Sequence, residues 1–191
     1  DFSLGDANIY VTGTEEGALY KCSSGYTEQH LDSYQGHAGA VYKVKWSPYS
    51  PNTFLSCSAD WTVKLWNQDD SACAFSFQPS AEPVADASWS PECSTLFASV
   101  STDGLLALWD LGASTFEPVH QVSTGRRLSC VAFARASPVV VIGDDRGGVE
   151  VYQMLGSLAA PPWRTTADKV SELDRLMRSV SSKGGGGLVG G

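Results

Sequence analysis

Three residues with the chemistry of a hydrolytic triad lie in the first third of the chain: His37, Ser56 and Asp60. In serine hydrolases, a carboxylate orients an imidazole, and the imidazole accepts the proton of a nucleophilic hydroxyl. The same three groups can instead form a buried hydrogen-bonded chain in which each group satisfies its neighbour. Ser56 lies within an apolar run, and no loop with an oxyanion-binding pattern is recognisable. We therefore favour a structural role over catalysis.

The segment that must position these groups, FLSCSADWTVKLW (54–66), has the pattern of a β-hairpin. Two apolar runs flank a polar turn at 58–61. Similar hairpins recur at 9–22, 96–110 and 139–152, with the last aromatic slot stepping by 43–44 residues. A second marker with the same period precedes three of the hairpins: VKWSP, ASWSP and VAFAR, whose aromatic residues are Trp46, Trp89 and Phe133. Two markers that share one period indicate an internal repeat.

A period of 43–44 residues is typical of a four-stranded propeller blade, which predicts an all-β fold. In the unit 36–78 we expect strands at Val41–Trp46, Thr53–Ser58, Thr62–Trp66 and Cys73–Phe77. The next units are 79–122 and 123–155. Residues 1–35 supply the end of an earlier blade, with its last strand at Glu28–Tyr34.

Three and a half blades do not close a ring, since closed propellers have four to eight blades. We expect this chain to be the C-terminal half of a seven-bladed propeller, with the remaining blades in a preceding part of the protein. Closure by another chain is the alternative. The chain begins with Asp-Phe-Ser rather than Met, which favours a piece of a longer polypeptide.

After the last blade the pattern changes to a proline-containing linker at 156–165, an amphipathic helix at 166–180 and a flexible glycine-rich tail at 181–191. The apolar stripe of the helix comprises Val170, Leu173, Leu176, Met177 and Val180. This stripe either packs on the flank of the propeller or docks on a partner. Leu173, Leu176 and Met177 are therefore candidate partner-binding residues.

The composition argues against several classes of function. The net charge is −8 and the pI is about 4.7, so nucleic acid is an unfavourable partner. No apolar stretch is long enough to span a membrane. There is no P-loop and no metal-ligand cluster, so we expect no cofactor. The five cysteines lack zinc or disulfide spacing, and we expect buried free thiols in a reducing compartment.

The blade 36–78 resembles the WD-repeat family through Gly36-His37, the turn Asp60 and Trp66. The Trp-Asp pair itself occurs at Trp109-Asp110. The resemblance implies a hydrogen-bonded chain through His37, through Ser56 or Ser58, and on to Asp60 and Trp66. The later units depart from this pattern, because Glu82 and Arg126 stand near the histidine position. Asp103 therefore has no histidine partner in its unit.

A longer stretch, residues 8–180, resembles the axonemal dynein intermediate chains. The matching motifs are TGTEEG, KCS, the Gly-His pair, VYKVKW, SCSADWTVKLW and GDDRGG. The wording of TGTEEG and YTEQHLDSYQGH is most similar to the inner-arm branch, that of the two-headed dynein f. Outer-arm and cytoplasmic intermediate chains are alternatives.

This resemblance implies a non-catalytic scaffold located in the cytoplasm and the axoneme of cilia or flagella. Its implied partners are the dynein heavy-chain tail, a second intermediate chain and other dynein-arm subunits. The light-chain-binding extension of that family is missing from these residues, so we expect no light-chain site here. A general WD-repeat adaptor outside the axoneme remains an alternative, and a propeller enzyme is a weaker one.

Hairpin turns at one end of a propeller are natural contact points for a partner. Trp61 is a candidate anchor, because an exposed aromatic residue at a turn can fill a partner's pocket. It can instead stack on a neighbouring blade. The other candidates at these turns are Glu15, Glu16, Asp145 and Arg146.

Overall fold

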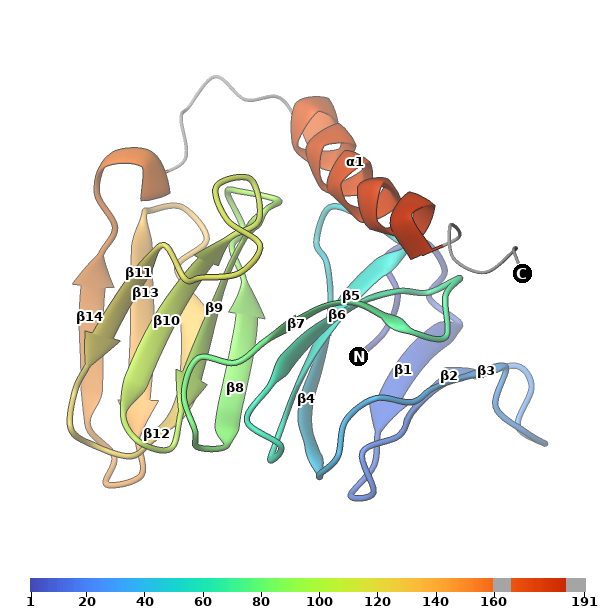
Figure 1. The fold of residues 1–191 in the computed structure, drawn as a ribbon, viewed down its shortest axis with the longest axis horizontal. Helices are drawn as coiled ribbons and strands as arrows, with labels where there is room; N and C mark the ends of the chain where they lie inside the picture. Colours follow the sequence, from blue (N-terminus) through green and yellow to red (C-terminus); the bar gives the residue numbers. More distant parts are fainter. Residues whose placement is uncertain (160–165, 185–191) are drawn as a thin grey trace, which may run out of the picture.

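Four antiparallel β-sheets follow one another along the chain and stand side by side as successive wedges (Figure 1). The computed structural model describes residues 1–159 and 166–184. The all-β propeller architecture predicted from the repeat is confirmed. We number the sheets as blades 1 to 4 in chain order.

The strands of each blade are consecutive in sequence and pair only with their neighbours. Blade 1 contains β1 (Ile9–Gly13), β2 (Leu19–Ser23) and β3 (Asp32–Tyr34). Blade 2 contains β4 (Val41–Trp46), β5 (Thr53–Ser58), β6 (Val63–Asn67) and β7 (Cys73–Phe77). Blade 3 contains β8 (Val84–Trp89), β9 (Leu96–Ser101), β10 (Leu105–Asp110) and β11 (His120–Ser123). Blade 4 contains β12 (Leu128–Phe133), β13 (Val139–Asp144) and β14 (Val149–Gln153).

Blade 2 follows its sequence prediction closely, since β4, β5 and β7 have the expected bounds. The predicted strand Glu28–Tyr34 is wrong at its start, because β3 begins only at Asp32. Only Leu19–Lys21 of β2 pair with β3. Ser23, at the end of β2, instead forms a bridge with Tyr26, so the segment before Asp32 does not pair as a strand.

Blade 1 also retains the end of its innermost strand, which the sequence prediction missed. Phe2 bridges Tyr10 of β1, and the Ser3 amide donates to the Ile9 carbonyl at 2.8 Å. Phe2 lies 44 residues before Trp46, so it occupies the aromatic position that ends the innermost strand in the later blades.

Apolar clusters fill the seams between successive blades. In blade 2 the rings of Phe54 and Trp66 stack with centroids 6.2 Å apart, and in blade 3 Phe97 and Trp109 repeat the arrangement at 5.9 Å. Stacked aromatic pairs bury large areas in a defined geometry. These pairs contribute to the apolar clusters through which the faces of neighbouring blades pack on each other.

The innermost strands also share polar links. The indole N–H of Trp46 donates to the Asp1 carbonyl at 3.2 Å, and that of Trp89 donates to the Lys45 carbonyl at 3.1 Å. The two acceptors are equivalent, because Asp1 directly precedes Phe2 and Lys45 directly precedes Trp46, the corresponding aromatic residues of the preceding blades. Phe133 occupies the same position in blade 4 and has no N–H group, so this link ends there.

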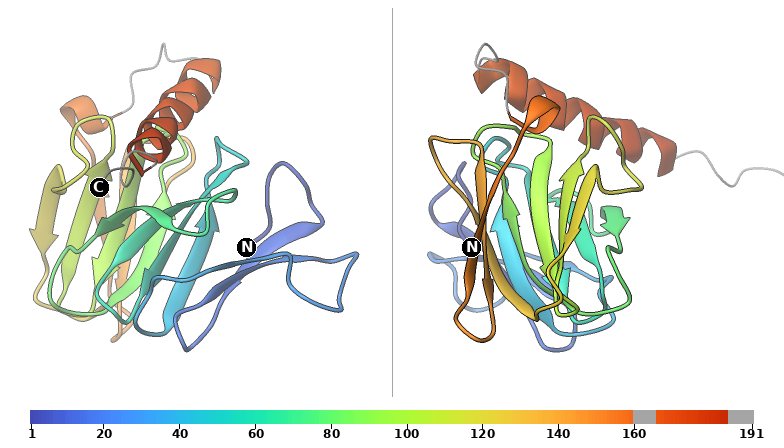
Figure 2. Two further views of the ribbon diagram at one scale, coloured as in Figure 1. Left: turned by 45° about the vertical axis from the view of Figure 1, so that its right-hand side comes forward. Right: turned by 90° about the vertical axis from the view of Figure 1, so that its left-hand side faces the viewer.

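Helix α1 (Thr166–Gly184) lies across one end of the strands, and the short 3-10 turn η1 (Gly156–Leu158) precedes it (Figures 1 and 2). The helix runs four residues past its predicted end. The rest of the predicted linker, residues 160–165, and residues 185–191 of the predicted tail lie outside the described residues. No described helix has the length and apolarity required to cross a bilayer.

Candidate functional site

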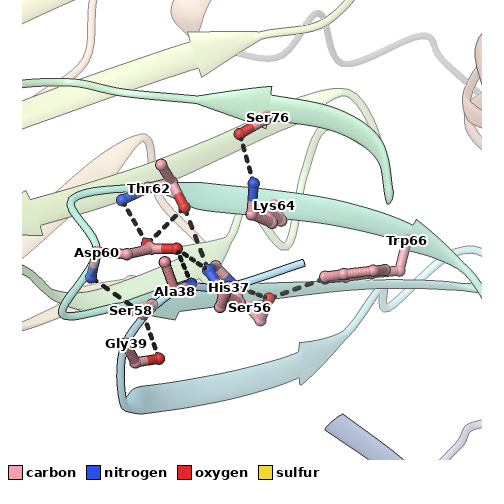
Figure 3. A network of polar contacts seen from close by, with 10 residues as sticks. All are labelled: His37, Ala38, Gly39, Ser56, Ser58, Asp60, Thr62, Lys64, Trp66 and Ser76. Carbon is pink, nitrogen blue, oxygen red and sulfur yellow. Dashed lines mark hydrogen bonds and ion pairs between the residues drawn. The ribbon is translucent and has the colours of Figure 1, made fainter. Parts of the chain in front are cut away.

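A continuous chain of hydrogen bonds runs from the turn of blade 2 to its central tryptophan (Figure 3). His37 lies in the loop before β4, Ser56 on β5 and Trp66 on β6. His37 Nδ1 is 2.9 Å from Asp60 Oδ2, and His37 Nε2 is 2.7 Å from Ser56 Oγ. The Trp66 indole donates to Ser56 Oγ at 2.8 Å. Ser56 is therefore the hydroxyl in the chain.

Ser58 lies on the same face of β5 but has another role. Its hydroxyl donates to the Gly39 carbonyl at 2.9 Å and accepts from the Asp60 amide at 3.1 Å. It thus fastens the turn to the loop before β4. The structure separates two serines that the strand pattern alone leaves equivalent.

The Asp60 carboxylate is saturated with donors. Oδ2 accepts from the Ala38 amide at 2.9 Å, while Oδ1 accepts from the amide and hydroxyl of Thr62 at 3.0 and 2.6 Å. Burial raises the pKa of Asp60, but the bonds from Thr62, Ala38 and His37 outweigh it and bring the pKa to about 2. Asp60 is therefore ionised at neutral pH.

The His37 imidazole is neutral. Burial lowers its pKa, and this outweighs the opposing pull of the hydrogen bond and charge of Asp60. The donor pattern agrees with a neutral ring. An ionised Asp60 carboxylate can only accept, so His37 Nδ1 is the protonated nitrogen, and in the neutral ring Nε2 accepts the proton of the Ser56 hydroxyl, whose oxygen accepts from Trp66. The ring proton sits on Nδ1 and is donated to Asp60.

The distances within Ser56, His37 and Asp60 match those of a catalytic triad, yet the site is closed. Ser56 has no solvent-exposed surface, and the Trp66 indole occupies its remaining hydrogen-bonding side. A nucleophile must reach a substrate carbonyl beside an oxyanion-binding site. This arrangement can fix the turn of blade 2, but it offers no space for a reacting group.

Blade 3 keeps only part of the network. The Trp109 indole donates to Ser99 at 2.9 Å, as Trp66 does to Ser56. Asp103 is exposed and accepts from the Ser101 hydroxyl and from the Leu105 amide at 3.3 Å. Asp110 instead accepts from the Thr95 hydroxyl at 2.6 Å, beyond the network. Among the described residues, no chain of hydrogen bonds joins the turn to the tryptophan in this blade.

In blade 4 an arginine stands near the histidine position. Arg126 approaches Asp144 at 3.4 Å, and the Arg126 side chain is more than half exposed. Asp144 also accepts from the amides of Gly148 and Arg146 at 2.6 and 2.9 Å. Hydrogen bonds from those amides hold the pKa of Asp144 below its usual value. The turn of blade 4 is therefore organised by Asp144. This residue lies two positions before Arg146, which occupies the place that Asp60 has in blade 2.

Asp86 is a buried carboxylate that the sequence prediction did not single out. It lies on β8, the innermost strand of blade 3. Oδ1 is 3.2 Å from Lys43 Nζ of blade 2, while Oδ2 accepts from the Val131 amide of blade 4 at 3.1 Å. One side chain therefore links three blades. The signal in the sequence is a lone carboxylate within the apolar strand VADASW.

The model of the "WD domain, G-beta repeat" family matches residues 28–67 and 71–110. These segments contain the network of blade 2 and the indole–hydroxyl pair of blade 3. The chain thus contains two WD repeats, in blades 2 and 3. A chain in a crystal structure of the mitotic checkpoint complex shares the WD-repeat fold, with a TM-score of 0.72 and 17% identity over 80% of this chain and 48% of that one.

The WD-repeat chain is also similar to dynein intermediate chains. It is 43% identical over 155 residues to dynein axonemal intermediate chain 4 of Rattus norvegicus, and 47% identical over 156 residues to that of Danio rerio. These matches cover 80% and 81% of this chain. Dynein axonemal intermediate chain 1 of Bos taurus is 39% identical over 184 residues. The chain spans 19%, 20% and 26% of these relatives, respectively.

The helix residues named as candidate partner contacts pack on the WD-repeat blades instead. Leu173 and Met177 are buried in the cluster between blades 2 and 3, and Leu176 packs against the same cluster. The Ser50 hydroxyl donates to Asp174 at 2.9 Å and fixes the helix further. For Leu173 and Met177 the partner-docking interpretation is wrong, because the chain's own blades already cover both side chains.

The turn residues named as candidates are at the surface. Glu15, Glu16, Trp61, Asp145 and Arg146 are all exposed. They lie in the hairpin turns at the end of the strands opposite α1 (Figure 1). The structure leaves them accessible to a partner.

The cysteines of the WD-repeat chain are free thiols, but the expected burial is wrong for most of them. Cys57 alone is buried, and burial raises the pKa of its thiol. Cys130 is exposed, and the other three are partly buried. Cys130 lies on β12 of blade 4, and the described residues contain no fifth blade that could cover this strand. Within those residues, no group of three or more His, Cys, Asp or Glu side chains is arranged to hold a metal ion.

Proposed function

We propose that this chain forms part of the propeller of an axonemal dynein intermediate chain and acts as a non-catalytic scaffold of the motor. The observation that carries the proposal is the 43–47% identity to dynein axonemal intermediate chain 4 over four fifths of the chain. The fold alone would not suffice, because WD-repeat propellers serve many functions.

The geometry of the site supports a scaffold. The only triad-like arrangement among the described residues is sealed by Trp66 and by its own burial. Rigid blades instead present exposed loops at both ends, which suits a subunit that holds other proteins in place. In this role the propeller binds the heavy-chain tail, together with a second intermediate chain and other dynein-arm subunits, in the cytoplasm and the axoneme.

The proposal is tested with the full-length protein, tagged in a ciliated cell. Axonemes are isolated, extracted with salt, and the tagged protein is purified under native conditions. We expect dynein heavy chains to copurify in stoichiometric amounts. A tagged protein that stays out of the axoneme, or that purifies without any heavy chain, would refute the proposal and favour an adaptor elsewhere in the cell.

The identity of the heavy chain separates the members of the family. We propose that the chain belongs to the inner-arm dynein, because the sequences of its TGTEEG and YTEQHLDSYQGH segments are most similar to that branch. Peptides from two inner-arm heavy chains in the purified complex would support this assignment. Outer-arm or cytoplasmic heavy chains would assign the protein to those motors instead.

A further inference from the structure

Trp61 occupies a backbone position that the other blades give to glycine. It has a φ of 74°, while the matching residues Gly17, Gly104 and Gly147 have φ values of 90°, 91° and 84°. Trp61 is the only residue other than glycine with a positive φ among the described residues. A left-handed conformation is unfavourable for a bulky L-residue, whereas glycine adopts it freely. The repeat therefore favours glycine, and blade 2 departs from it.

No hydrogen bond or aromatic contact within the described part of the chain explains this departure. The four other described tryptophans each donate their indole N–H, to Asp1, Ser56, Lys45 or Ser99. In the same part of the chain, the Trp61 indole makes no hydrogen bond and no contact with another aromatic ring. Its side chain is 44% exposed. Among the described residues, Trp61 does not stack on an aromatic ring of a neighbouring blade.

The surroundings of Trp61 are acidic. We define the turn face of blades 1 to 3 as residues 14–17, 35–40, 59–62, 78–83 and 101–104. This face contains no Lys or Arg, and it exposes the carboxylates of Glu15, Glu16, Glu82 and Asp103. The basic residues Arg126, Arg127 and Arg146 belong to blade 4, and the Arg126 backbone adjoins the turn of blade 3 at Gly104, on the side away from blade 2.

Close contacts connect the turn of blade 1, through the loop before β4, to the turn that carries Trp61. The turn of blade 1 reaches the loop before β4, because a Cβ added to Gly17 would lie 2.4 Å from the His37 carbonyl oxygen. Gly39 of that loop in turn approaches the Asp60 amide, beside Trp61. In blade 3 the Thr102 hydroxyl donates to Glu82 at 3.5 Å. Exposed carboxylates thus lie on the two blades that adjoin blade 2, at the same end of the strands as Trp61.

We infer that Trp61 is the anchor of a binding surface for a basic protein segment that carries an apolar pocket. The indole fills the pocket, its free N–H finds an acceptor there, and the flanking carboxylates attract Lys and Arg side chains. An indole face also binds such cations directly. A central tryptophan within a polar rim is the usual composition of an energetic hot spot. The inference rests on the proposed function only in naming the heavy-chain tail as the source of this segment.

Trp61→Gly gives an unusually sharp test, because it should affect binding and stability in opposite directions. The full-length protein and its variants are copurified with the heavy-chain tail at several salt concentrations. We expect Trp61→Gly to weaken binding about tenfold or more, as the loss of a tryptophan anchor does. Its melting temperature should equal or exceed that of the wild type, since glycine suits the left-handed turn. Trp61→Phe should retain part of the binding.

Phe116→Gly is the matched control. Phe116 is 89% exposed, but it lies in the loop between β10 and β11, at the other end of the strands. Its loss should leave binding unchanged. Wild-type affinity in Trp61→Gly would overturn the inference, and so would a lowered melting temperature, which would show that Trp61 supports the fold.

A second probe separates this inference from the proposed function. Binding to a synthetic amphipathic peptide of Lys and Leu, whose apolar face stands in for the pocket, is measured for the wild type and Trp61→Gly. If neither binds the heavy-chain tail, the proposed function fails, and the peptide decides about Trp61. Loss of peptide binding in Trp61→Gly alone would then support the anchor, whereas equal binding would overturn it.

Discussion

Asp60 and Asp103 occupy the same position in successive blades, yet their surroundings differ. Asp60 is nearly buried and accepts from His37, Thr62 and the Ala38 amide. Asp103 is exposed and serves only its own turn, through Ser101 and the Leu105 amide. Because His37 is present, the Asp60 carboxylate does more than cap its own turn: through His37 it connects the turn and the loop before β4 to Ser56 in the middle of the sheet.

This difference predicts unequal losses of stability. Asp60→Ala should lower the free energy of unfolding by about 1–3 kcal/mol, because it removes the charged acceptor of the buried His37 N–H and leaves only the Thr62 hydroxyl, 3.2 Å from His37 Nδ1, in its place. Asp103→Ala should cost about 0.5–1 kcal/mol, since water replaces the carboxylate at an exposed turn. Urea denaturation of the full-length protein measures both. Equal losses would contradict the view that the network of blade 2 has a special role.

The lowered pKa of His37 predicts a dependence of stability on pH. Its pKa is lower in the folded protein than in the unfolded chain, so the unfolded chain binds the proton more tightly. The stability is fully present above about pH 6.5 and falls as the pH drops below that value, by at most about 1.4 kcal/mol per pH unit. Asp60 adds a further loss only between about pH 4 and pH 2, where its carboxylate gains a proton in the unfolded chain first.

His37→Gln isolates this effect, because it removes one titrating group and leaves His30 and His120 in place. We expect the variant to be less stable at pH 7.5 but to show a flatter decline between pH 7 and pH 5. Denaturation midpoints across that interval provide the measurement. Parallel curves for the variant and the wild type would mean that His37 titrates alike in both states.

At the residue scale, sequence reasoning found the members of the network but not all of their partners. Ser56 and Ser58 could not be separated, since residues two apart share a face of a strand. Asp86 escaped notice because its partners, Lys43 and Val131, come from two other blades. Contacts between blades depend on their rotation about the ring, which a repeat period does not specify.

At the scale of elements, α1 acts as a cover over the seam between blades 2 and 3. Leu173 has no exposed surface and Met177 almost none, and both join the cluster of Trp109 and Leu111. A helix of this length is marginal in isolation, so its stability must come from this packing. The sequence showed the stripe, but it could not show whether the stripe met its own propeller or another protein.

The packing predicts the cost of truncating the helix stripe. Leu173→Ala should lower the free energy of unfolding by about 2–4 kcal/mol, the usual result of opening a cavity in a core. Arg175→Ala, on the exposed face of the same helix, should change it by less than about 0.5 kcal/mol. Thermal unfolding and the rate of proteolysis within α1 distinguish the two. A small loss for Leu173→Ala would show that the helix contributes little to the seam.

The prediction of elements was reliable where two markers repeated and weaker where one was missing. The strands of blade 2 were placed from the Trp46 and Trp66 markers together, and three of them had the predicted bounds. The innermost strand of blade 1 was missed although Phe2 fits the period, because only a single bridge of that strand is present. The start of β3 was wrong, since no marker fixes the outermost strand.

At the scale of the whole molecule, each blade covers the face of the next, so the faces at the two ends of the row have no cover within the described residues. On blade 4 the side chains of Val149 and Val151 are 66% and 65% exposed on β14. On blade 1 Phe2 and Leu4 are exposed as well. Apolar surfaces of this kind favour association. The chain spans only 19% and 26% of these relatives, which leaves room for the further blades we propose.

If further blades close the ring, replacing Val149 and Val151 should affect residues 1–184 alone and the full-length protein differently. In residues 1–184 alone, Val149→Thr with Val151→Thr should reduce dye binding and self-association and leave the melting temperature unchanged, because both side chains are exposed and threonine retains strand propensity. In the full-length protein, the same pair should lower the free energy of unfolding by about 2–4 kcal/mol, because each hydroxyl would then be buried against the next blade. Phe116→Ser, in an exposed loop away from both end faces, is the control and should be neutral in both contexts. If the double variant were neutral in the full-length protein as well, no further blade would pack on β14, and the propeller would have to close in another way.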